Sequence, residues 1–188
     1  MCPGTGSILT NSSGKISTGR STYANSISCQ WIIAPTSSSL VSLRFSTFDT
    51  AYGDLVTVYT CIDVNCSEST RVLLAQASGS VPPSEIISAT GIMLVTFASD
   101  ARLTASGFVA IYSTPCPEGS FTPEFGEPCT RCRTGCLYGK HLQGICAAGA
   151  SVDTTRCVCP TGSFDGGDES APCTSCNVIC PEGKHSSS

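Results

Sequence analysis

Two aspartates in separate turns are the residues of this sequence best suited to bind a metal ion. Asp54 follows Tyr52-Gly53, and Asp100 follows Ser99, each beside an apolar run. Ca²⁺ prefers oxygen ligands, usually carboxylates from separate loops together with carbonyls and water. The two residues are therefore predicted to form a calcium site where their loops meet. The alternative is that each aspartate accepts turn hydrogen bonds only, as aspartate commonly does in such turns.

Catalytic chemistry finds no support in the same sequence. The two histidines, His141 and His185, stand in equivalent Gly-Lys-His triplets, which indicates a repeated turn rather than a catalytic base. The 188 residues contain no His-Glu-x-x-His, no Gly-x-Ser-x-Gly and no phosphate-binding Gly-x-x-x-x-Gly-Lys-Ser/Thr pattern. We expect this chain not to be an enzyme.

Cysteine usage indicates an oxidising, extracellular or cell-surface environment. There are 14 cysteines and only 13% charged residues, and a reducing cytosol would leave such a chain without its cross-links. Two glycosylation sequons, at Asn11 and Asn65, agree with that environment. The cysteines expected to form disulfides are Cys2, Cys29, Cys61, Cys66, Cys116, Cys129, Cys132, Cys136, Cys146, Cys157, Cys159, Cys173, Cys176 and Cys180.

Charge and hydropathy exclude other classes of partner. The net charge is −4 and no cluster of Lys and Arg occurs, so nucleic acid and anionic membrane surfaces are not expected partners. No apolar run approaches the roughly 20 residues of a spanning helix. The first residues also lack the pattern of a signal peptide, and the chain is expected to be a mature fragment of a longer protein.

The apolar residues that must position the two aspartates alternate with a period of two. Val41, Leu43 and Phe45 lie on one predicted face, and the runs 93–97 and 108–112 behave in the same way. No window of helical length has a helical apolar period. Many short strands separated by turns predict an all-β antiparallel sandwich, with Trp31 as a core residue.

The order of the motifs in this part of the chain resembles the CUB domain family. The resemblance covers about residues 2–113. It is carried by Cys29-Gln-Trp-Ile-Ile, Leu43-x-Phe-x-x-Phe48-Asp49, Gly53-Asp54-Leu-Val-x-Val-Tyr59, Ile92-Met-Leu-Val-x-Phe-x-Ser-Asp100 and Gly107-Phe-Val-Ala-Ile-Tyr112. The resemblance implies a jelly-roll-like sandwich of two antiparallel sheets. It also implies disulfides from Cys2 to Cys29 and from Cys61 to Cys66.

The same resemblance implies which residues would bind calcium. Calcium-binding CUB domains combine a Glu shortly after Phe-Asp with two later aspartates, which correspond here to Asp54 and Asp100. The Glu position falls at about Ala51, which has no carboxylate. Asp49, a water molecule or backbone carbonyls are the expected substitutes for this ligand, at lower affinity because fewer negative charges face the ion.

The remaining residues contain a repeat. It is offset by 43 residues at its first cysteine (159 minus 116): Cys116-Pro-Glu-Gly-Ser-Phe, Pro128-Cys-Thr-x-Cys132, Cys136 and Gly139-Lys-His141 recur as Cys159-Pro-Thr-Gly-Ser-Phe, Pro172-Cys-Thr-x-Cys176, Cys180 and Gly183-Lys-His185. Such self-similarity predicts a stack of small units. The pattern looks like the Cys-rich repeats of EGF-like, ephrin-receptor-like or TNF-receptor-like surface proteins, and spacing alone does not choose the disulfide pairing.

Two cation sites in the repeats are weighed against simpler interpretations. The Cys-x-x-Cys pairs at 129–132 and 173–176 could be halves of a zinc site, but they lie too far apart for a compact zinc ribbon, and disulfides are favoured. The run Asp165-Gly-Gly-Asp168-Glu169 lacks EF-hand spacing and is interpreted as a solvated turn.

These observations predict three parts and one main function. The parts are a CUB-like sandwich over 1–115, a first Cys-rich repeat over 116–158 and a second, truncated repeat over 159–188. The predicted function is a non-catalytic extracellular module, assisted by calcium, that binds proteins or glycans or assembles with copies of itself. The alternatives are a structural component of an extracellular filament or matrix and an ancillary region of a secreted protease.

Overall fold

The regular structure of the chain consists of β-strands. The computed structural model describes residues 6–19, 21–36 and 40–175, and in these ranges no helix is found that could cross a membrane. The chain divides into two compact units, one of Met1–Pro115 with Glu124–Pro128 and the other of Cys116–Pro123 with Cys129–Ser188.

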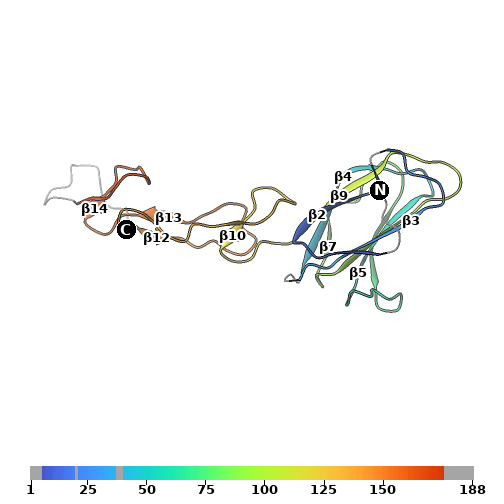
Figure 1. The fold of residues 1–188 in the computed structure, drawn as a ribbon, viewed down its shortest axis with the longest axis horizontal. Helices are drawn as coiled ribbons and strands as arrows, with labels where there is room; N and C mark the ends of the chain where they lie inside the picture. The colour runs from blue at the N-terminus through green and yellow to red at the C-terminus, as the bar shows by residue number, and fades with distance from the viewer. Residues whose placement is uncertain (1–5, 20, 37–39, 176–188) are drawn as a thin grey trace. The chain divides into compact units, whose positions relative to one another are not determined.

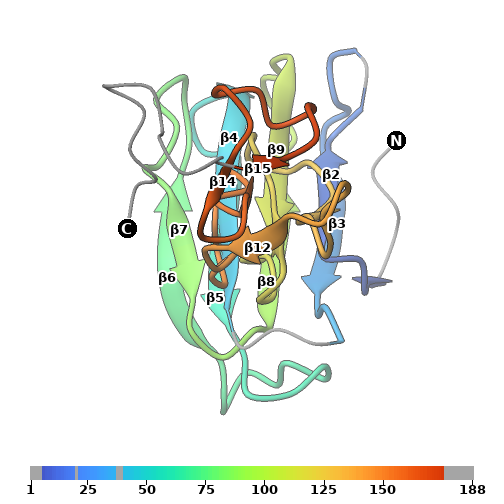
Figure 2. The same ribbon diagram turned by 90° about the vertical axis from the view of Figure 1, so that its left-hand side faces the viewer.

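The first unit is a sandwich of two sheets (Figure 1). The five-stranded sheet has the order β1 (Ser7–Leu9), β3 (Ser28–Ile33), β8 (Met93–Ala98), β5 (Leu55–Thr60) and β6 (Val72–Ala77). The four-stranded sheet has the order β2 (Ser13–Ser17), β9 (Gly107–Ser113), β4 (Val41–Asp49) and β7 (Ile86–Ser88), and Figure 2 shows these four side by side. This architecture confirms the predicted all-β sandwich.

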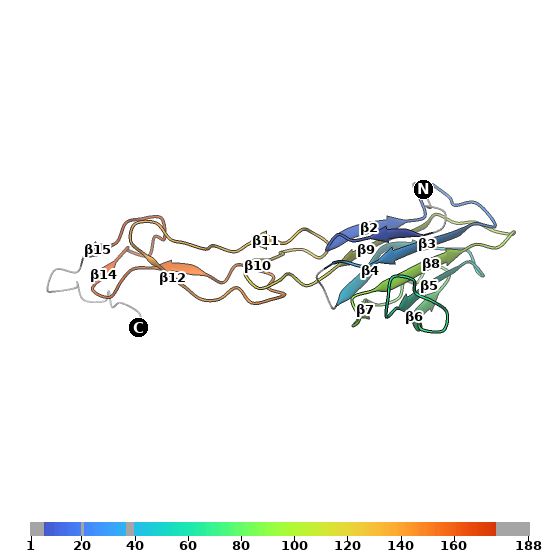
Figure 3. The same cartoon turned by 60° about the horizontal axis from the view of Figure 1, so that its bottom comes forward.

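The sheets depart from the predicted pattern at one edge. β1 pairs with β3 in parallel, with Ser7 opposite Trp31, whereas every other strand pair of the sandwich is antiparallel in the described residues. The Gly- and Ser-rich first 26 residues therefore contribute two strands, β1 and β2, one to each layer (Figure 3). Their short polar sequences carry little period-2 signal, so the sequence does not reveal these two strands.

A β-bulge explains the spacing of the apolar residues in β4. Leu43 and Phe45 follow strict alternation, but the next inward residue is Phe48 rather than position 47. The register of β4 against β9 shifts between Phe45 and Thr47, so Ser46 is the extra residue. A bulge of this kind adds one residue to one strand and reverses the facing of those that follow it.

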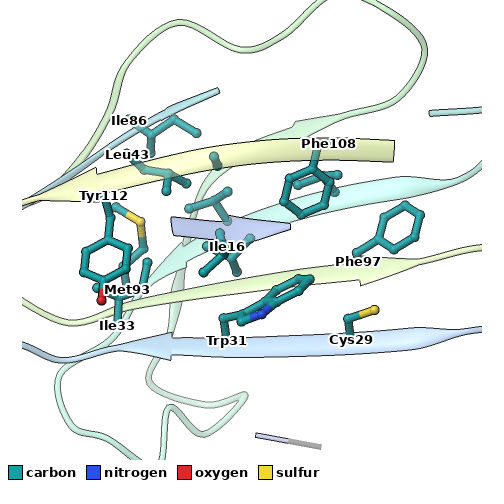
Figure 4. Close-up of a cluster of buried hydrophobic side chains, with 14 of the residues drawn as sticks. Ile16, Cys29, Trp31, Ile33, Leu43, Ile86, Met93, Phe97, Phe108 and Tyr112 are labelled. Atoms are coloured by element: carbon teal, nitrogen blue, oxygen red, sulfur yellow. The ribbon is translucent and has the colours of Figure 1, made fainter. Parts of the chain in front are cut away.

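The core between the sheets is centred on Phe108. Its ring makes edge-on contacts with Trp31, Phe45 and Phe97 at centroid distances of 5.7, 5.5 and 5.9 Å. Figure 4 shows the labelled side chains of the two layers pointing toward one another. Offset and edge-on aromatic pairs add to the stabilisation that burial itself supplies. Trp31 is thus a core residue, 3% exposed, as predicted.

The outer face of the five-stranded sheet carries a second small cluster. Leu94 points away from the main core and is nevertheless 3% exposed, because Cys61 and Cys66 pack against it together with Tyr59 and Ile32. β8 is therefore buried on both faces at this point, whereas the alternation predicted a sheet with one solvated face.

The second unit consists of short hairpins and disulfides. The hairpins pair β10 (Ser120–Phe121) with β11 (Thr130–Arg131), β12 (His141–Gln143) with β13 (Arg156–Val158), and β14 (Ser163–Phe164) with β15 (Thr174–Ser175). The first and the last of these hairpins share the same hydrogen bond from a serine side chain to a proline carbonyl. Ser120 Oγ donates to the carbonyl of Pro117 at 2.8 Å, and Ser163 Oγ donates to that of Pro160 at 2.7 Å.

The position of Phe108 predicts a large loss of stability on truncation. Phe108→Ala should lower the free energy of unfolding by about 3–5 kcal/mol, because it removes the ring shared by both sheets and leaves a cavity. Leu103→Ala, at a side chain that is 69% exposed, is the matched control and should change it by less than about 0.5 kcal/mol. Denaturant unfolding measures both, and equal losses would contradict the placement of Phe108 at the centre of the core.

Candidate metal centre

Asp54 lies in a turn that buries its carboxylate completely. The chain leaves β4 and reverses at Gly53, whose φ of +97° is a conformation that favours glycine. The backbone N–H of Asp54 closes this turn by donating to the carbonyl of Ala51 at 3.0 Å. The Asp54 side chain then points inward and is 0% exposed.

Both carboxylate oxygens of Asp54 accept hydrogen bonds from other loops. The hydroxyl of Tyr23 donates to Oδ2 at 2.5 Å, and the backbone N–H of Asp100 donates to Oδ1 at 2.7 Å. The Tyr23 hydroxyl in turn accepts from the N–H of Ala51 at 2.7 Å. Asp54 therefore holds together the loops 22–26, 50–54 and 99–106, a set that we call the Asp54 loops.

Asp100 meets Asp54 through its backbone, while its own carboxylate is exposed. Its Oδ1 accepts from the N–H of Arg102 at 2.8 Å, and its carbonyl accepts from the N–H of Ser26 at 2.8 Å. Its Oδ2 lies beside Gly53, 3.4 Å from the position a Cβ would occupy there. The structure thus brings together the two aspartates that the sequence singled out.

Asp49 has a different environment. It is exposed at the end of β4, and its Oδ2 accepts hydrogen bonds from the hydroxyl and the N–H of Ser106 at 2.6 and 3.2 Å. These bonds hold the pKa of Asp49 below its ordinary value. The carboxylate predicted as a substitute ligand is therefore bound to Ser106, and Ala51 stands in the Asp54 turn without an acidic side chain.

Oxygen ligands at the Asp54 loops suit calcium, although they are few. The two carboxylates are ligands of the kind that Ca²⁺ prefers, whereas the Tyr23 hydroxyl is engaged with Asp54 and Ala51. No Lys, Arg or His nitrogen within the described ranges forms an ion pair with Asp54. A buried carboxylate is normally paired with a cation or a metal or is hydrogen-bonded, and Asp54 is hydrogen-bonded through both of its oxygens.

Sequence reasoning missed Tyr23. It lies in a stretch rich in Gly, Ser and Thr, residue types that favour turns over regular structure. The signal was present in its residue type, because a lone aromatic in a polar stretch must find an apolar environment. Its ring packs edge-on against Phe97 at 4.9 Å, and its hydroxyl reaches Asp54.

The cysteines of the second unit form disulfides rather than metal sites. The described pairs are Cys61–Cys66 in the sandwich and Cys116–Cys129, Cys132–Cys146, Cys136–Cys157 and Cys159–Cys173 beyond it. In the described residues, one group of three potential metal ligands is found, Cys132, Cys146 and Asp153, and its two sulfurs are bonded to each other. Of the two Cys-x-x-Cys pairs, Cys129, Cys132 and Cys173 are therefore bonded in disulfides, and Cys176 lies outside the described residues.

The other predicted site residues are dispersed. Cys29 is disulfide-bonded, and its expected partner Cys2 lies outside the described residues, as do Cys176, Cys180 and His185. His141 is exposed in β12 opposite Val158. Asn11 and Asn65 are exposed, which permits the predicted glycosylation.

Burial raises the pKa of Tyr23 to about 12, and the hydrogen bond to Asp54 acts in the same direction. Hydrogen bonds with Ala51 and Ala105 lower it in part. A phenol that donates to a buried carboxylate keeps its proton, because losing it would place two negative charges side by side.

Tyr23→Phe should destabilise the sandwich by about 1–3 kcal/mol, because it leaves Asp54 without a donor and the Ala51 N–H without an acceptor. Since the pKa is raised, this contribution is complete below pH 10 and is lost as the pH rises toward about 12. The deficit of the variant relative to the parent should shrink over that window in thermal unfolding. Tyr52→Phe, at a side chain that is 94% exposed, is the control, and equal stabilities for the two variants would contradict the arrangement.

Comparison with known proteins places the sandwich among extracellular modules. The chain is 35% identical over 97 residues to the astacin-like metalloendopeptidase of Coturnix japonica, which covers 49% of this chain and 22% of that protein. It is 32% identical over 95 residues to the human procollagen C-endopeptidase enhancer 2, covering 48% and 22%. The chain thus spans about a fifth of the length of these relatives.

A solved structure and a family model complete the comparison. The structure of the MASP-1 CUB2 domain bound to Ca²⁺ matches with a TM-score of 0.48 and 18% identity, covering 57% of this chain and 96% of that one. The model of the CUB domain family matches residues 2–112, which is more than half of the chain. The chain therefore belongs to the CUB domain family.

Proposed function

We propose that this chain is a non-catalytic extracellular module of a larger secreted or cell-surface glycoprotein, and that it binds proteins or glycans through the Asp54 loops. The observation that carries the proposal is the fully buried carboxylate of Asp54, which fixes three loops from one point. Loops held by a rigid scaffold are where binding residues concentrate. These loops also expose large side chains, with Tyr52 at 94% and Leu103 at 69%.

We infer that calcium assists this binding. Asp54 and Asp100 would hold the ion, with the remaining positions filled by carbonyls and water. The ion would neutralise a buried carboxylate that has only neutral hydrogen-bond donors around it in the described residues. It would thereby stiffen the loops that present Tyr52 and Leu103.

The two alternative functions differ in their support. A role as an ancillary region of a secreted protease has the astacin-like relatives in its favour, and a protease segment outside residues 1–188 would support it, but it is not preferred over the main proposal. A structural role in a filament has a specific observation behind it, namely the equivalent β10–β11 and β14–β15 hairpins. The likeness of these repeats to EGF-like, ephrin-receptor-like or TNF-receptor-like units stays a prediction.

The binding surface can be tested with cells as the probe. A fluorescent, tetramerised form of the chain should bind cultured animal cells, and the double variant Tyr52→Ser/Leu103→Ser should bind at least tenfold more weakly because it removes the exposed apolar side chains. Ile87→Ser, at a side chain of β7 that is 50% exposed, is the control and should bind like the parent. Flow cytometry that finds the double variant unchanged would exclude the Asp54 loops as the contact surface.

Calcium binding has its own test. A site in the range of 10⁻⁴ M should raise the free energy of unfolding by about 2.7 kcal/mol at a concentration 100 times its Kd, relative to EGTA. Asp100→Asn should abolish this increase while keeping the backbone N–H that holds Asp54, and Asp49→Asn should retain it, since Asp49 binds Ser106. Thermal unfolding and titration calorimetry measure the effect. A parent chain equally stable in calcium and EGTA would refute the site and leave the binding surface to be judged by the cell assay.

A further inference from the structure

Lys140 is a lysine whose charge is almost completely buried in the second unit. Its side chain is 1% exposed, although lysine is rarely buried unless it is paired. It follows Tyr138 and Gly139, both in left-handed backbone conformations, and its N–H donates to the carbonyl of Leu137 at 3.2 Å. This tight turn directs the side chain inward from the first predicted repeat.

The ammonium of Lys140 is bound by three oxygens of the second predicted repeat. It donates to Oδ2 of Asp165 at 2.8 Å and to the carbonyls of Asp168 and Glu169 at 3.1 and 2.8 Å. An ammonium has three donors and no acceptor, so these bonds satisfy it in full. The run 165–169 is a turn with residues 166–169 exposed, as interpreted from sequence, and three of its oxygens also bind the Lys140 ammonium.

The loop is shaped for this contact by its own hydrogen bonds. Oδ1 of Asp165 accepts from the N–H of Gly167 at 3.0 Å, and the carbonyl of Asp168 accepts from the N–H of Ala171 at 3.1 Å. The hydrogen bond from Lys140 is the main cause that holds the pKa of Asp165 below its ordinary value of 3.8. The carboxylate is therefore charged throughout the neutral range.

A second basic residue of the first repeat contacts the same loop. Arg133 Nη1 donates to Oε2 of Glu169 at 2.7 Å, and its N–H donates to Asp153 at 2.9 Å. The pair of Arg133 and Glu169 is 41% and 50% exposed, so solvent weakens it and its contribution is small. The buried contact of Lys140 is the stronger determinant.

Cross-linking does not explain why the two repeats would keep one orientation. The described disulfides beyond the sandwich lie within 116–157 or within 159–173, and none of them joins the two ranges. The chain passes from Cys157 to Cys159 through Val158 alone. Within the described residues this linker is the covalent connection between the two ranges, so side-chain contacts must contribute to the orientation of the repeats.

We propose that Lys140 and the loop 165–169 form a lock, a contact that fixes the orientation of the two Cys-rich repeats relative to each other. Lys140 of the first repeat is the recognition residue, and the acidic loop of the second repeat is its partner. With the lock in place the two repeats move as one rigid body, whereas without it they would move independently about the linker. It depends on neither calcium nor an external partner, so its test is independent of the proposed function.

Amine reactivity of the native chain tests the lock directly. With limiting acetylating reagent, Lys140 should react at least tenfold more slowly than Lys15, which is exposed in β2. Asp165→Asn should raise the Lys140 rate at least fivefold, because an amide holds the ammonium less firmly than a carboxylate does. Glu118→Gln, at an exposed residue of the first repeat, is the control and should leave the rate unchanged. Equal rates for Lys140 and Lys15 in the parent would overturn the proposal.

Hydrogen exchange supplies the reciprocal measurement. Lys140→Met keeps the apolar stem and removes the charge, and it should speed amide exchange in the peptide spanning 165–171 at least tenfold, while peptides of the sandwich stay unchanged. Arg131→Met, at an exposed position of β11, should have no effect. The double variant Lys140→Met/Asp165→Asn should exchange no faster than Lys140→Met alone, because the two groups act on each other. Unchanged exchange of the loop in Lys140→Met would refute the lock.

Discussion

The arrangement of the sandwich depends on one buried negative charge. A carboxylate removed from water costs several kcal/mol unless hydrogen bonds or a cation replace the water. Asp54 meets this requirement by accepting hydrogen bonds from the Tyr23 hydroxyl and from the Asp100 N–H. These two residues lie 31 and 46 positions away in sequence. The loops of three different strand connections are therefore bound to the same two oxygen atoms.

The layers of the sandwich make that convergence possible. Phe97 in β8 supports the ring of Tyr23, and Phe108 in β9 supports Phe97, so the aromatic core continues directly into the loops. The bulge at Ser46 keeps Phe48 inward and so continues β4 up to the turn that carries Asp54. The geometry of the loops is thus an extension of the core packing, which is why residues of such different sequence contexts meet there.

Sequence reasoning predicted the parts of this arrangement that follow local rules. The alternation around Leu43, Val95 and Phe108 identified core strands because burial of one face imposes a period of two. The parallel strand β1 and the role of Tyr23 escaped it, since both depend on partners far along the chain and leave no periodic signal. The contact of the loop 165–169 with Lys140 escaped it for the same reason, because Lys140 is 25 residues away from Asp165.

Each unit contains an aspartate that is partly or fully buried, and the two aspartates have different kinds of partner. Asp165 has a lysine ammonium as its partner, so its charge is balanced by the protein itself and a metal ion would have to displace Lys140. Asp54 is surrounded by neutral donors, so its hydrogen bonds are satisfied while its charge is not balanced by a described cationic side chain. Hydrogen bonding from neutral groups lowers the cost of a buried charge without removing its long-range field. This contrast is the reason that the proposed cation site is at Asp54 and not at Asp165, although fewer carboxylates gather at Asp54 than a strong calcium site would use.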